Sequence, residues 1–337
     1  MNKDKQIDIL AIGDVAIDVF IKIIDAEAKC DLEGEHCKLC VSYGGKIPYE
    51  SAEICYAVGN SSNVAVSASR LGLKSALMAN MGDDLNGVEC LNVLKKEKVD
   101  TTFVKKEEGR PTNYHYVLWY GAERTILVKH EKYNYEWTKT KESEEYQSPS
   151  WIYLSSLGEN SKSFHNEVID YLKEHTEVKL AFQPGTLQIK LGTDVLKEIY
   201  KNTEVFFCNH EEAQKILEIE ESDIPKLTRM IHALGPKIVV ITDGISGSYS
   251  YDGTEALYMK AYYQDTIEST GAGDAFSGAF VSALSLGKNI SDALMWGAAN
   301  AASVVLHVGP QKGLLTRKLI EECVEKMQAD YRPTKTN

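Results

Sequence analysis

The sequence lacks an excess of positive charge. Its 337 residues include 37 Lys and Arg against 49 Asp and Glu, which gives a formal net charge of −12. A chain with this balance offers no basic surface that would attract a polyanion. We therefore predict that nucleic acid is not a partner of this protein.

Long apolar runs are also missing. No apolar stretch reaches the ~18 residues that a membrane-spanning helix needs, and the apolar run after the charged N-terminal residues is too short for a signal peptide. We therefore expect a cytoplasmic protein without membrane contact. The chain is long enough, with 43% hydrophobic residues, to form one large domain with an appendage.

The cysteine content is low and odd in number. Seven Cys in a chain without a secretion signal favour reduced thiols over a disulfide framework. Four of them gather in one stretch of the sequence: Cys30, Cys37, Cys40 and Cys55. Cys37 and Cys40 have the two-residue gap of many zinc sites, but a second pair at matching spacing is absent. We expect free thiols on a loop, with a metal or redox role as the alternative, and assign no function to the insert at 25–56.

Short apolar runs alternate with helical patterns along most of the chain. Residues 7–12 have the pattern of a strand buried on both faces, 63–71 that of a helix, and 75–81 that of a second strand. The same alternation resumes over residues 151–241. Repeated units of this kind predict an α/β fold, with a mainly parallel central sheet flanked by helices.

Two segments differ from this pattern. Residues 15–24 alternate between apolar and other side chains, and residues 113–129 have the signature of a hairpin. Together they predict a small β-sheet lid beside the main sheet. The expected organisation is one domain over residues 1–330, lid segments at approximately 14–58 and 110–131, and a tail without ordered structure at 331–337.

A glycine-rich turn is the most informative part of the sequence. Gly271-Ala272-Gly273-Asp274 stands before a stretch with the apolar spacing of a helix face. Backbone N–H groups at such a helix start converge on an anion, and a carboxylate beside them is placed to take a proton from an attacking hydroxyl. A lone Gly-x-Gly-Asp, however, is more often a helix cap after a turn.

The longer string Ser-Thr-Gly-Ala-Gly-Asp-Ala-Phe resembles the C-terminal signature of the ribokinase-like (phosphofructokinase-B type) family of carbohydrate and nucleoside kinases. The family's N-terminal signature is matched by Gly59-Asn60-Ser61-Ser62-Asn63, which leads to Arg70-Leu71-Gly72. The resemblance covers roughly residues 7–315. It implies a ribokinase-like, Rossmann-like fold and an ATP-dependent kinase that transfers the γ-phosphate to a hydroxymethyl group of a small sugar.

The resemblance also implies roles for individual residues. Asp274 would be the catalytic base, and Gly271, Ala272 and Gly273 would form the anion hole. The residues implied in substrate binding are Asp18, Gly59, Asn60 and Asn63. The residues implied in ATP binding are Asn209, Thr242, Gly244, Gly247 and Asn300, with Glu212 implied in positioning Mg²⁺ through water. A bare Asn-x-x-Glu and an isolated Asn63 are also ordinary helix-cap patterns.

The sequence departs from the family pattern at Glu268, and it also allows other functions. Glu268 stands where the family usually has Asp, which puts a monovalent-cation site in doubt. The nearest rival is a nucleoside kinase, because Gln183-Pro184-Gly185 and the aromatic side chains of Tyr114, Tyr116 and Trp119 leave room for a base to stack. A sugar-sensing protein without chemistry is a further alternative, against which the intact Asp274 argues. The apolar lid favours a homodimer.

Overall fold

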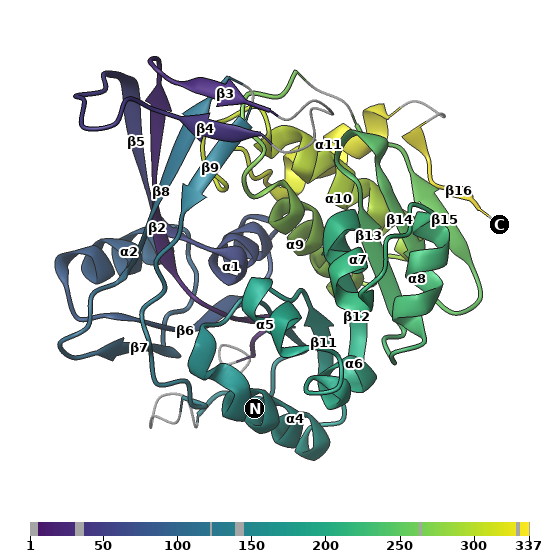
Figure 1. The fold of residues 1–337 in the computed structure, drawn as a ribbon. Helices are drawn as coiled ribbons and strands as arrows, with labels where there is room; N and C mark the ends of the chain where they lie inside the picture. The colour runs from purple at the N-terminus through teal and green to yellow at the C-terminus, as the bar shows by residue number, and fades with distance from the viewer. Residues whose placement is uncertain are drawn as a thin grey trace.

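The computed structural model describes residues 6–30, 37–121, 123–138, 145–262, 265–327 and 331–336. A central sheet has ten strands in the order β16-β15-β14-β13-β12-β11-β10-β1-β6-β7. The seven strands from β13 to β7 run parallel, and β14, β15 and β16 are antiparallel to their neighbours. The predicted α/β fold with a mainly parallel sheet is therefore confirmed (Figure 1).

The strands of this sheet are β1 (Ile9–Ile12), β6 (Ser75–Gly82), β7 (Val104–Glu107), β10 (Trp151–Leu154), β11 (Lys179–Phe182), β12 (Thr203–Asn209), β13 (Ile238–Thr242), β14 (Ser248–Tyr251), β15 (Ala256–Met259) and β16 (Thr334–Lys335). The helices are α1 (Asn60–Arg70), α2 (Leu85–Lys96), α4 (Lys162–Glu174), α5 (Thr186–Leu191), α6 (Lys197–Asn202), α7 (His210–Leu217), α8 (Ile224–His232), α9 (Ala272–Ser285), α10 (Ile290–Val304) and α11 (Arg317–Lys326). Short 3-10 turns occur at Glu159–Ser161 and Gly244–Ser246.

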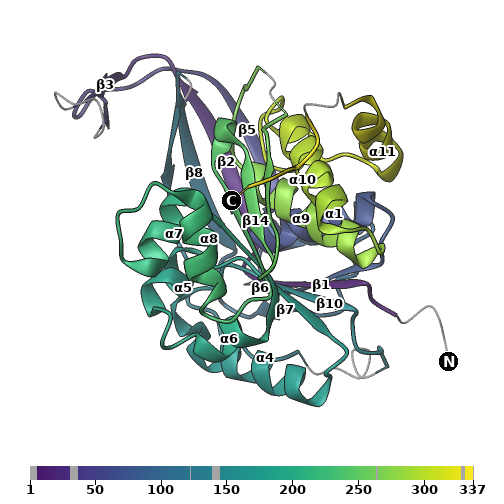
Figure 2. The same cartoon turned by 90° about the vertical axis from the view of Figure 1, so that its right-hand side faces the viewer.

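Helices cover both faces of the sheet, as Figure 2 shows. Side chains of β1 alternate between two apolar clusters, with Ile9 and Ala11 in one and Leu10 and Ile12 in the other. The first cluster includes residues of α1, α2, α9, α10 and α11, and the second includes residues of α4, α6, α7 and α8. A strand buried on both faces needs an apolar side chain at every position, which explains its unbroken apolar run.

A smaller sheet of four strands forms the predicted lid. Its order is β5-β2-β8-β9, with β2 at Ala16–Ile23, β5 at Tyr49–Val58, β8 at Asn113–Tyr120 and β9 at Glu123–Leu127. β2 pairs with β8 in parallel, so that Asp18 lies beside His115, and it pairs with β5 in antiparallel, so that Asp18 lies beside Cys55. These three side chains share the inner face of the lid, since successive residues of a strand point to opposite faces.

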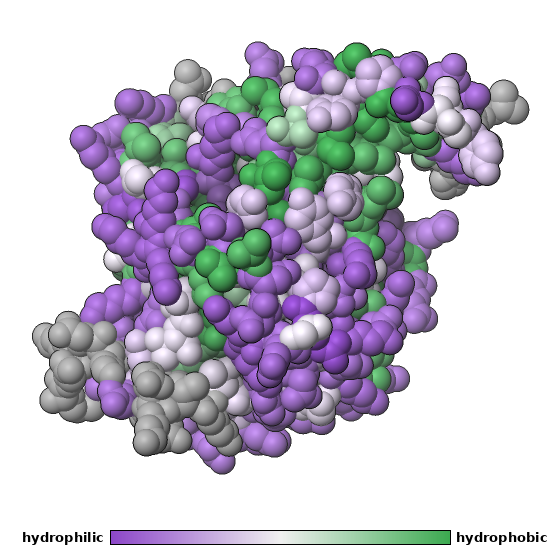
Figure 3. Space-filling model, turned by 90° about the vertical axis from the view of Figure 1, so that its left-hand side faces the viewer, coloured by the Kyte–Doolittle hydropathy of each residue, from purple (hydrophilic) through white to green (hydrophobic). Residues whose placement is uncertain are grey.

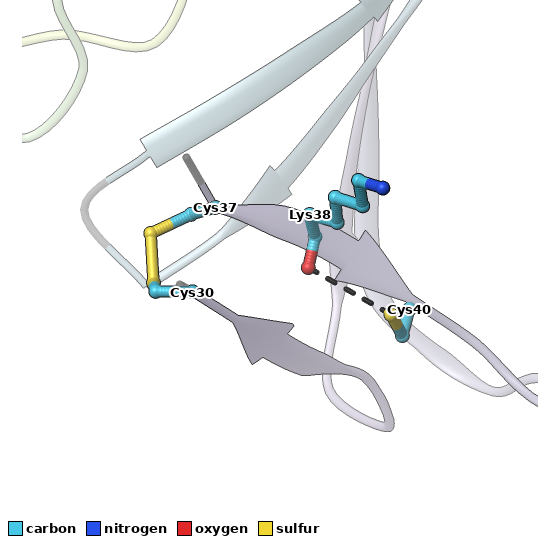
Figure 4. The surroundings of a disulfide bond; sticks show 4 residues. All are labelled: Cys30, Cys37, Lys38 and Cys40. Carbon is cyan, nitrogen blue, oxygen red and sulfur yellow. Dashed lines mark hydrogen bonds between the residues drawn. A yellow bond between two sulfur atoms is a disulfide. The ribbon is translucent and has the colours of Figure 1, made fainter. Parts of the chain in front are cut away.

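The cysteine-rich insert corrects one expectation. Cys30 and Cys37 form a disulfide bond, whereas we expected free thiols (Figure 4). The reason is a hairpin of β3 (Glu27–Lys29) and β4 (Lys38–Cys40), in which Lys29 pairs with Lys38 and the next two residues are Cys30 and Cys37. The other cysteines, Cys40, Cys55, Cys90, Cys208 and Cys323, are free.

The chain end corrects a second expectation. Residues 331–337 were predicted to lack ordered structure, but Thr334–Lys335 pair with β15 as the edge strand β16. Backbone pairing with an open sheet edge needs no apolar side chains, so hydropathy does not reveal it. Within the described ranges, the helices are too short or too polar to cross a bilayer.

Candidate active site

The glycine turn opens α9 at the end of the chain segment that follows β15. Gly271 precedes the helix with a φ of +80°, and a Cβ there would lie 2.3 Å from the Cβ of Pro310. Gly273 differs, because a Cβ at its position would meet no atom of the described chain within 4 Å. No side chain caps the start of α9 among the described residues. The helix start is therefore open at Gly273. The N–H of Ala272 donates to the backbone oxygen of Ser269 at 3.2 Å, which leaves the N–H groups of Gly271 and Gly273 for an anion.

Asp274 lies in the first turn of α9, where three amide groups hold its carboxylate. The Nδ2 group of Asn60 donates to Oδ1 at 2.7 Å, Nδ2 of Asn63 donates to Oδ2 at 2.7 Å, and Nε2 of Gln183 donates to Oδ1 at 3.0 Å. Asp274 is only 6% exposed. The structure thus brings together residues from α1, from the end of β11 and from α9.

The environment of Asp274 suits a group that exchanges a proton. Burial raises the pKa of its carboxyl group, the three amides lower it in part, and the charge of Asp18 raises it again. A raised pKa makes the carboxylate a better proton acceptor, while the amides favour its ionised form and fix its direction. With the open helix start beside it, this carboxylate can accept a proton from a hydroxyl that attacks a bound phosphoryl group.

Asn63 does not cap a helix, which was the alternative interpretation of this residue. The residue before α1 is Gly59, whose φ is +115° and whose Cβ would lie 2.6 Å from the backbone oxygen of Asp14. Asn63 instead uses both ends of its amide, donating to Asp274 and accepting from Nε2 of Gln311 at 3.0 Å. Its orientation is therefore fixed on both sides.

Asp18 lies on the inner face of the lid and is 8% exposed. The Nδ1 atom of His115 lies 3.3 Å from its Oδ1 atom. The charge of Asp18 influences both Asp274 and the thiol of Cys55, whose pKa burial raises to about 12. Asp18 thus faces the space between the lid and the start of α9.

A second group of predicted residues lies where β12 and β13 end. Asn209 pairs with Thr242 at the carboxyl ends of these neighbouring parallel strands. Gly244 and Gly247 follow in the turn before β14. In a parallel sheet this edge is where ligands bind.

Asn209 and Glu212 cap the start of α7 reciprocally, as the Asn-x-x-Glu spacing also allowed. The Oδ1 atom of Asn209 accepts from the N–H of Glu212 at 2.8 Å, and Oε2 of Glu212 accepts from the N–H of Asn209 at 2.9 Å. Burial raises the pKa of Glu212, and the charge of Asp274 raises it further. Glu212 therefore caps α7, and its carboxylate is near enough to Asp274 for the two charges to repel each other.

Asn300 is the predicted site residue that the structure does not bring to the site. It is fully buried in α10, where its Nδ2 donates to the backbone oxygen of Ala275 at 2.8 Å and to Oγ of Ser67 at 3.2 Å. Its Oδ1 accepts from the N–H of Leu315 at 2.9 Å. With all of these bonds made inside the core, Asn300 ties α1, α9 and the segment after α10 together.

Several contacts of the site were not predicted, among them those of Gln183, which the sequence suggested only as part of the room for a nucleoside base. Gln183 accepts a hydrogen bond from Oγ of Ser277 at 2.8 Å and one from the hydroxyl of Tyr153, and this network directs its amide toward Asp274. Its sequence signal is a polar residue at the carboxyl end of a buried strand, β11. Asp14 follows the end of β1 at Ile12 in a similar way. Arg124 of the lid has no such signal, because its role depends on contact with distant residues.

Arg124 connects the lid to the segment before the glycine turn. Its Nη1 donates to Oγ of Ser269 at 2.6 Å, and its Nε lies 3.5 Å from Oε1 of Glu268. Glu268 also accepts from the N–H of Thr270 at 2.8 Å and from its hydroxyl. A guanidinium group from this chain therefore already balances the charge of Glu268.

A separate cavity of about 580 Å³ lies between α4 and residues 145–149. Ile7, before the start of β1, forms part of its wall. The cavity is thus at the amino end of the parallel strands, away from Asp274, and we do not assign the chemistry to it.

Comparison with known proteins gives an independent result. Residues 27–317 match the family described as pfkB family carbohydrate kinase. The chain is 25% identical over 337 residues to a 5-dehydro-2-deoxygluconokinase of Bacillus subtilis, an alignment that covers 96% of this chain and 98% of that protein. It is 26% identical over 287 residues to a ribokinase of Haemophilus influenzae, which covers 84% and 91% of the two chains.

Solved structures resemble the fold over nearly the whole chain. The ribokinase of Arabidopsis thaliana complexed with ribose and ATP superposes with a TM-score of 0.74 at 19% identity, over 96% of this chain and 100% of that one. A nucleoside kinase of Methanocaldococcus jannaschii gives a TM-score of 0.73 at 19% identity, over 96% and 99%. At these identities the likeness concerns the fold.

Proposed function

Because the chain belongs to the pfkB family of carbohydrate kinases, we propose that it phosphorylates a hydroxymethyl group of a small sugar with Asp274 as the base. The observation that carries this proposal is the carboxylate of Asp274, held by three amides beside the open helix start at Gly273. A base must be ionised, fixed in direction and next to the position of the transferred group. The three amides, which favour the ionised form and fix its direction, and the open position at Gly273 support Asp274 in this role.

The reaction follows from this geometry. Asp274 takes the proton of the sugar hydroxyl as its oxygen forms a bond to the γ-phosphorus of ATP, and the bond to the β-phosphate oxygen breaks to release ADP. The N–H groups of Gly271 and Gly273 stabilise the charge on the phosphoryl oxygens, whereas that of Ala272 donates to the backbone oxygen of Ser269. Asn60, Asn63 and Gln183 position the carboxylate. The lid excludes water, which would otherwise compete with the sugar for the phosphoryl group.

We propose that ATP binds along the edge formed by Asn209, Thr242, Gly244 and Gly247. Mg²⁺ neutralises phosphate charge when bound, and Glu212 would hold it through water, since the described residues contain no group of three His, Cys, Asp or Glu that could bind an ion directly. Burial and the negative charge of Asp274 both raise the pKa of Glu212, and a cation near these carboxylates would offset that charge. Asn300 is left out of this site because its amide is used in the core.

One observation favours a sugar over a nucleoside. Tyr114 and Tyr116 flank His115 on β8, so both point to the outer face of the lid, away from Asp18. Trp119 shares the inner face with His115, but its Nε1 donates to the backbone oxygen of Gly121 at 3.0 Å and Lys22 lies over its ring. These aromatic side chains therefore offer no platform for a base beside Asp274.

The outer face of the lid supports a homodimer. Ile54, Tyr116 and Leu127 come from three of its strands and are 48%, 45% and 52% exposed. Figure 3 shows apolar residues gathered in the upper part of the face that contains the lid. We propose that two lids pair through this surface.

The experiment that tests the proposed function is an assay of ADP release with ATP, Mg²⁺ and a panel of sugars and nucleosides. Phosphorus NMR of the product identifies the hydroxyl that was phosphorylated. Phosphorylation of a sugar hydroxymethyl group is the expected result. Turnover with nucleosides alone would reject the sugar, and turnover with neither would reject the kinase.

A further inference from the structure

Gln311 holds the end of the Asn63 amide that does not face Asp274. Its Nε2 group donates to Oδ1 of Asn63 at 3.0 Å and to the backbone oxygen of Ala57 at 2.7 Å. Asn63 in turn donates from Nδ2 to Oδ2 of Asp274 at 2.7 Å. A continuous series of hydrogen bonds therefore leads from the backbone of Ala57 through two amides to the proposed base. We call these four residues the Gln311 chain.

The backbone oxygen of Ala57 is available to Gln311 because β5 has a bulge at this point. Two residues of β5, Tyr56 and Ala57, stand opposite one residue of β2, Ile17. Ala57 has a φ of +56°, which a residue other than glycine adopts only at a cost in free energy. Bulges leave backbone groups outside strand pairing and are frequent next to active sites. The strained conformation of Ala57 thus provides a fixed acceptor beside Gln311.

The fixed acceptor determines the direction of every hydrogen bond in the Gln311 chain. A backbone oxygen only accepts hydrogen bonds, so Gln311 must turn its NH₂ group toward Ala57. The same NH₂ group reaches Asn63, whose oxygen must face it, and the NH₂ group of Asn63 is then directed at the carboxylate. If either amide were reversed, two oxygens would face each other. Gln311 therefore ensures that Asp274 meets a donor.

The amide of Gln183 is held in a different way. Its Oε1 accepts hydrogen bonds from the hydroxyl groups of Ser277 and Tyr153. A hydroxyl group rotates and can either donate or accept, so it does not impose one orientation on an amide as a backbone oxygen does. Among these two amides, only that of Asn63 has its orientation imposed from behind.

The backbone of Gln311 is fixed as well. Nη1 of Arg70 donates to its oxygen at 2.7 Å, and two nitrogens of Arg70 donate to the carboxylate of Glu97. The preceding residue, Pro310, is the one that leaves no room for a side chain at Gly271. One segment after α10 thus supports both the proposed base and the glycine turn.

We propose that Gln311 is a positioning residue for phosphoryl transfer, which fixes the amide of Asn63 so that Asp274 receives its hydrogen bond and keeps the direction needed for proton transfer. This inference rests on the proposed function and deepens it. Burial raises the pKa of Asp274, and the hydrogen bond from Asn63 is the largest of the effects that lower it. Loss of the Gln311 donor should therefore raise this pKa.

Other titratable groups also act on Asp274 or feel its charge. They are Asp18 on β2, Glu212 on α7 and Tyr153 on β10. All three stay in place when only Gln311 is replaced by a neutral residue, so a change in the pKa of Asp274 reports on the amide of Asn63.

The variant that tests this role is Gln311→Met, which keeps the length of the side chain and removes its donor. The amide of Asn63 can then turn its oxygen toward Asp274. We expect kcat with the identified sugar to fall about tenfold and the KM for ATP to stay as in the wild type. The acid limb of the pH profile of kcat/KM should move to higher pH, because the base is protonated more easily.

Gln6→Met is the matched control. Gln6 also donates to a backbone oxygen, that of Ser148 at 3.2 Å, but it lies before β1 at the amino end of the parallel strands. This variant should keep the kcat and the pH profile of the wild type. An unchanged kcat and pH profile in Gln311→Met as well would overturn the proposal.

A double-mutant cycle separates positioning from packing. Asn63→Ala removes the amide through which Gln311 acts, so adding Gln311→Met to it should change kcat little. A further tenfold loss in the double variant would show that Gln311 acts by another route and would overturn the proposal. If Gln311→Met melts far below the wild type, Gln311→Asn replaces it, since an amide one methylene group shorter does not span both contacts. The same loss of kcat is expected.

Carboxyl ¹³C NMR distinguishes this inference from the proposed function. Asp274→Asn identifies the resonance of Asp274, and its titration gives the pKa in the wild type and in Gln311→Met without any substrate. A higher pKa in the variant, in a protein that phosphorylates no sugar or nucleoside, would support the Gln311 chain and reject the kinase. Sugar phosphorylation with the same pKa and the same kcat in both proteins would support the kinase and reject the Gln311 chain.

Discussion

The amide of Asn63 donates a 2.7 Å hydrogen bond to the carboxylate of Asp274, 211 positions further along the chain. The two residues belong to the two glycine-containing signatures, one before α1 and one before α9. These helices pack against each other, and Gly278 of α9 lies against Ser67 of α1, which allows the close approach. The contact joins the region proposed for the sugar to the proposed base.

Asp274→Asn should abolish most turnover. The amide keeps the shape of the carboxylate but does not accept a proton, so kcat should fall by about 10²- to 10⁴-fold. Stability should change little, because the cost of a buried charge is removed while one amide partner loses its acceptor. The measurement is kcat with the identified sugar, together with the melting temperature; near-wild-type turnover would reject Asp274 as the base.

The two glycines of the turn should respond differently to alanine. Gly271→Ala places a side chain at a φ of +80° and against Pro310, so it should lower the free energy of unfolding by about 1 kcal/mol or more. Gly273→Ala meets no atom and should fold normally. Its methyl group would enter the proposed phosphoryl position and reduce kcat by about 10- to 100-fold. Thermal melts and kinetics of both variants check this prediction. A Gly273→Ala variant with the kcat of the wild type would show that the phosphoryl group does not bind beside Gly273.

Glu212→Gln should weaken the use of Mg²⁺. The glutamine still accepts the hydrogen bond from the N–H of Asn209, so the cap of α7 and the fold should persist. Loss of the charge should raise the Mg²⁺ concentration for half-maximal rate by about tenfold. Its exposed neighbour provides the control, since Glu211→Gln should leave the magnesium dependence as in the wild type. If the rate depends on Mg²⁺ concentration in the same way in both variants, Glu212 only caps α7 and does not position Mg²⁺.

Asp14 predicts a pH dependence of stability. Its pKa is about 7 in the folded protein against 3.8 ordinarily, because burial opposes the charge. The folded state therefore binds the proton more tightly than the unfolded state does. The contribution of Asp14 to the free energy of unfolding is complete below pH 4 and is lost as the pH rises to 7. At about 1.4 kcal/mol for each pH unit, the loss reaches at most about 4 kcal/mol.

Asp14→Asn should remove this loss. Its free energy of unfolding, measured by urea denaturation, should exceed that of the wild type by an amount that grows from pH 4 to 7 and is constant above. A difference that does not vary with pH would show that Asp14 keeps an ordinary pKa in the folded protein.

Charge on the outer face of the lid should separate the proposed dimer. Tyr116→Asp should give monomers in light scattering at micromolar concentration, where the wild type should be dimeric. Leu319→Asp, on an exposed position of α11, is the control and should remain dimeric. A monomeric wild type would reject the dimer.

Local sequence determined the elements and their order. The apolar run of β1, the alternation of β2 and the glycine turn before α9 are recognisable because their periods and turn residues depend on neighbours in the chain. The positions of Asp274, Asn60 and Asn63 within their signatures follow from the same local patterns. The disulfide of Cys30 and Cys37 was missed even though it is local, because its hairpin register depends on strand pairing rather than on cysteine count.

Tertiary structure alone decided which polar residues meet. Asn300 and Asn63 are both polar residues in small-residue helices, yet one closes its hydrogen bonds inside the core and the other faces Asp274. Gln183 reaches Asp274 only because β11 ends beside the start of α9, and Asp14 meets His130 only because the lid folds over β1. Hydrogen bonds between distant segments depend on the packing of whole layers, and no pattern of neighbouring residues encodes that distance.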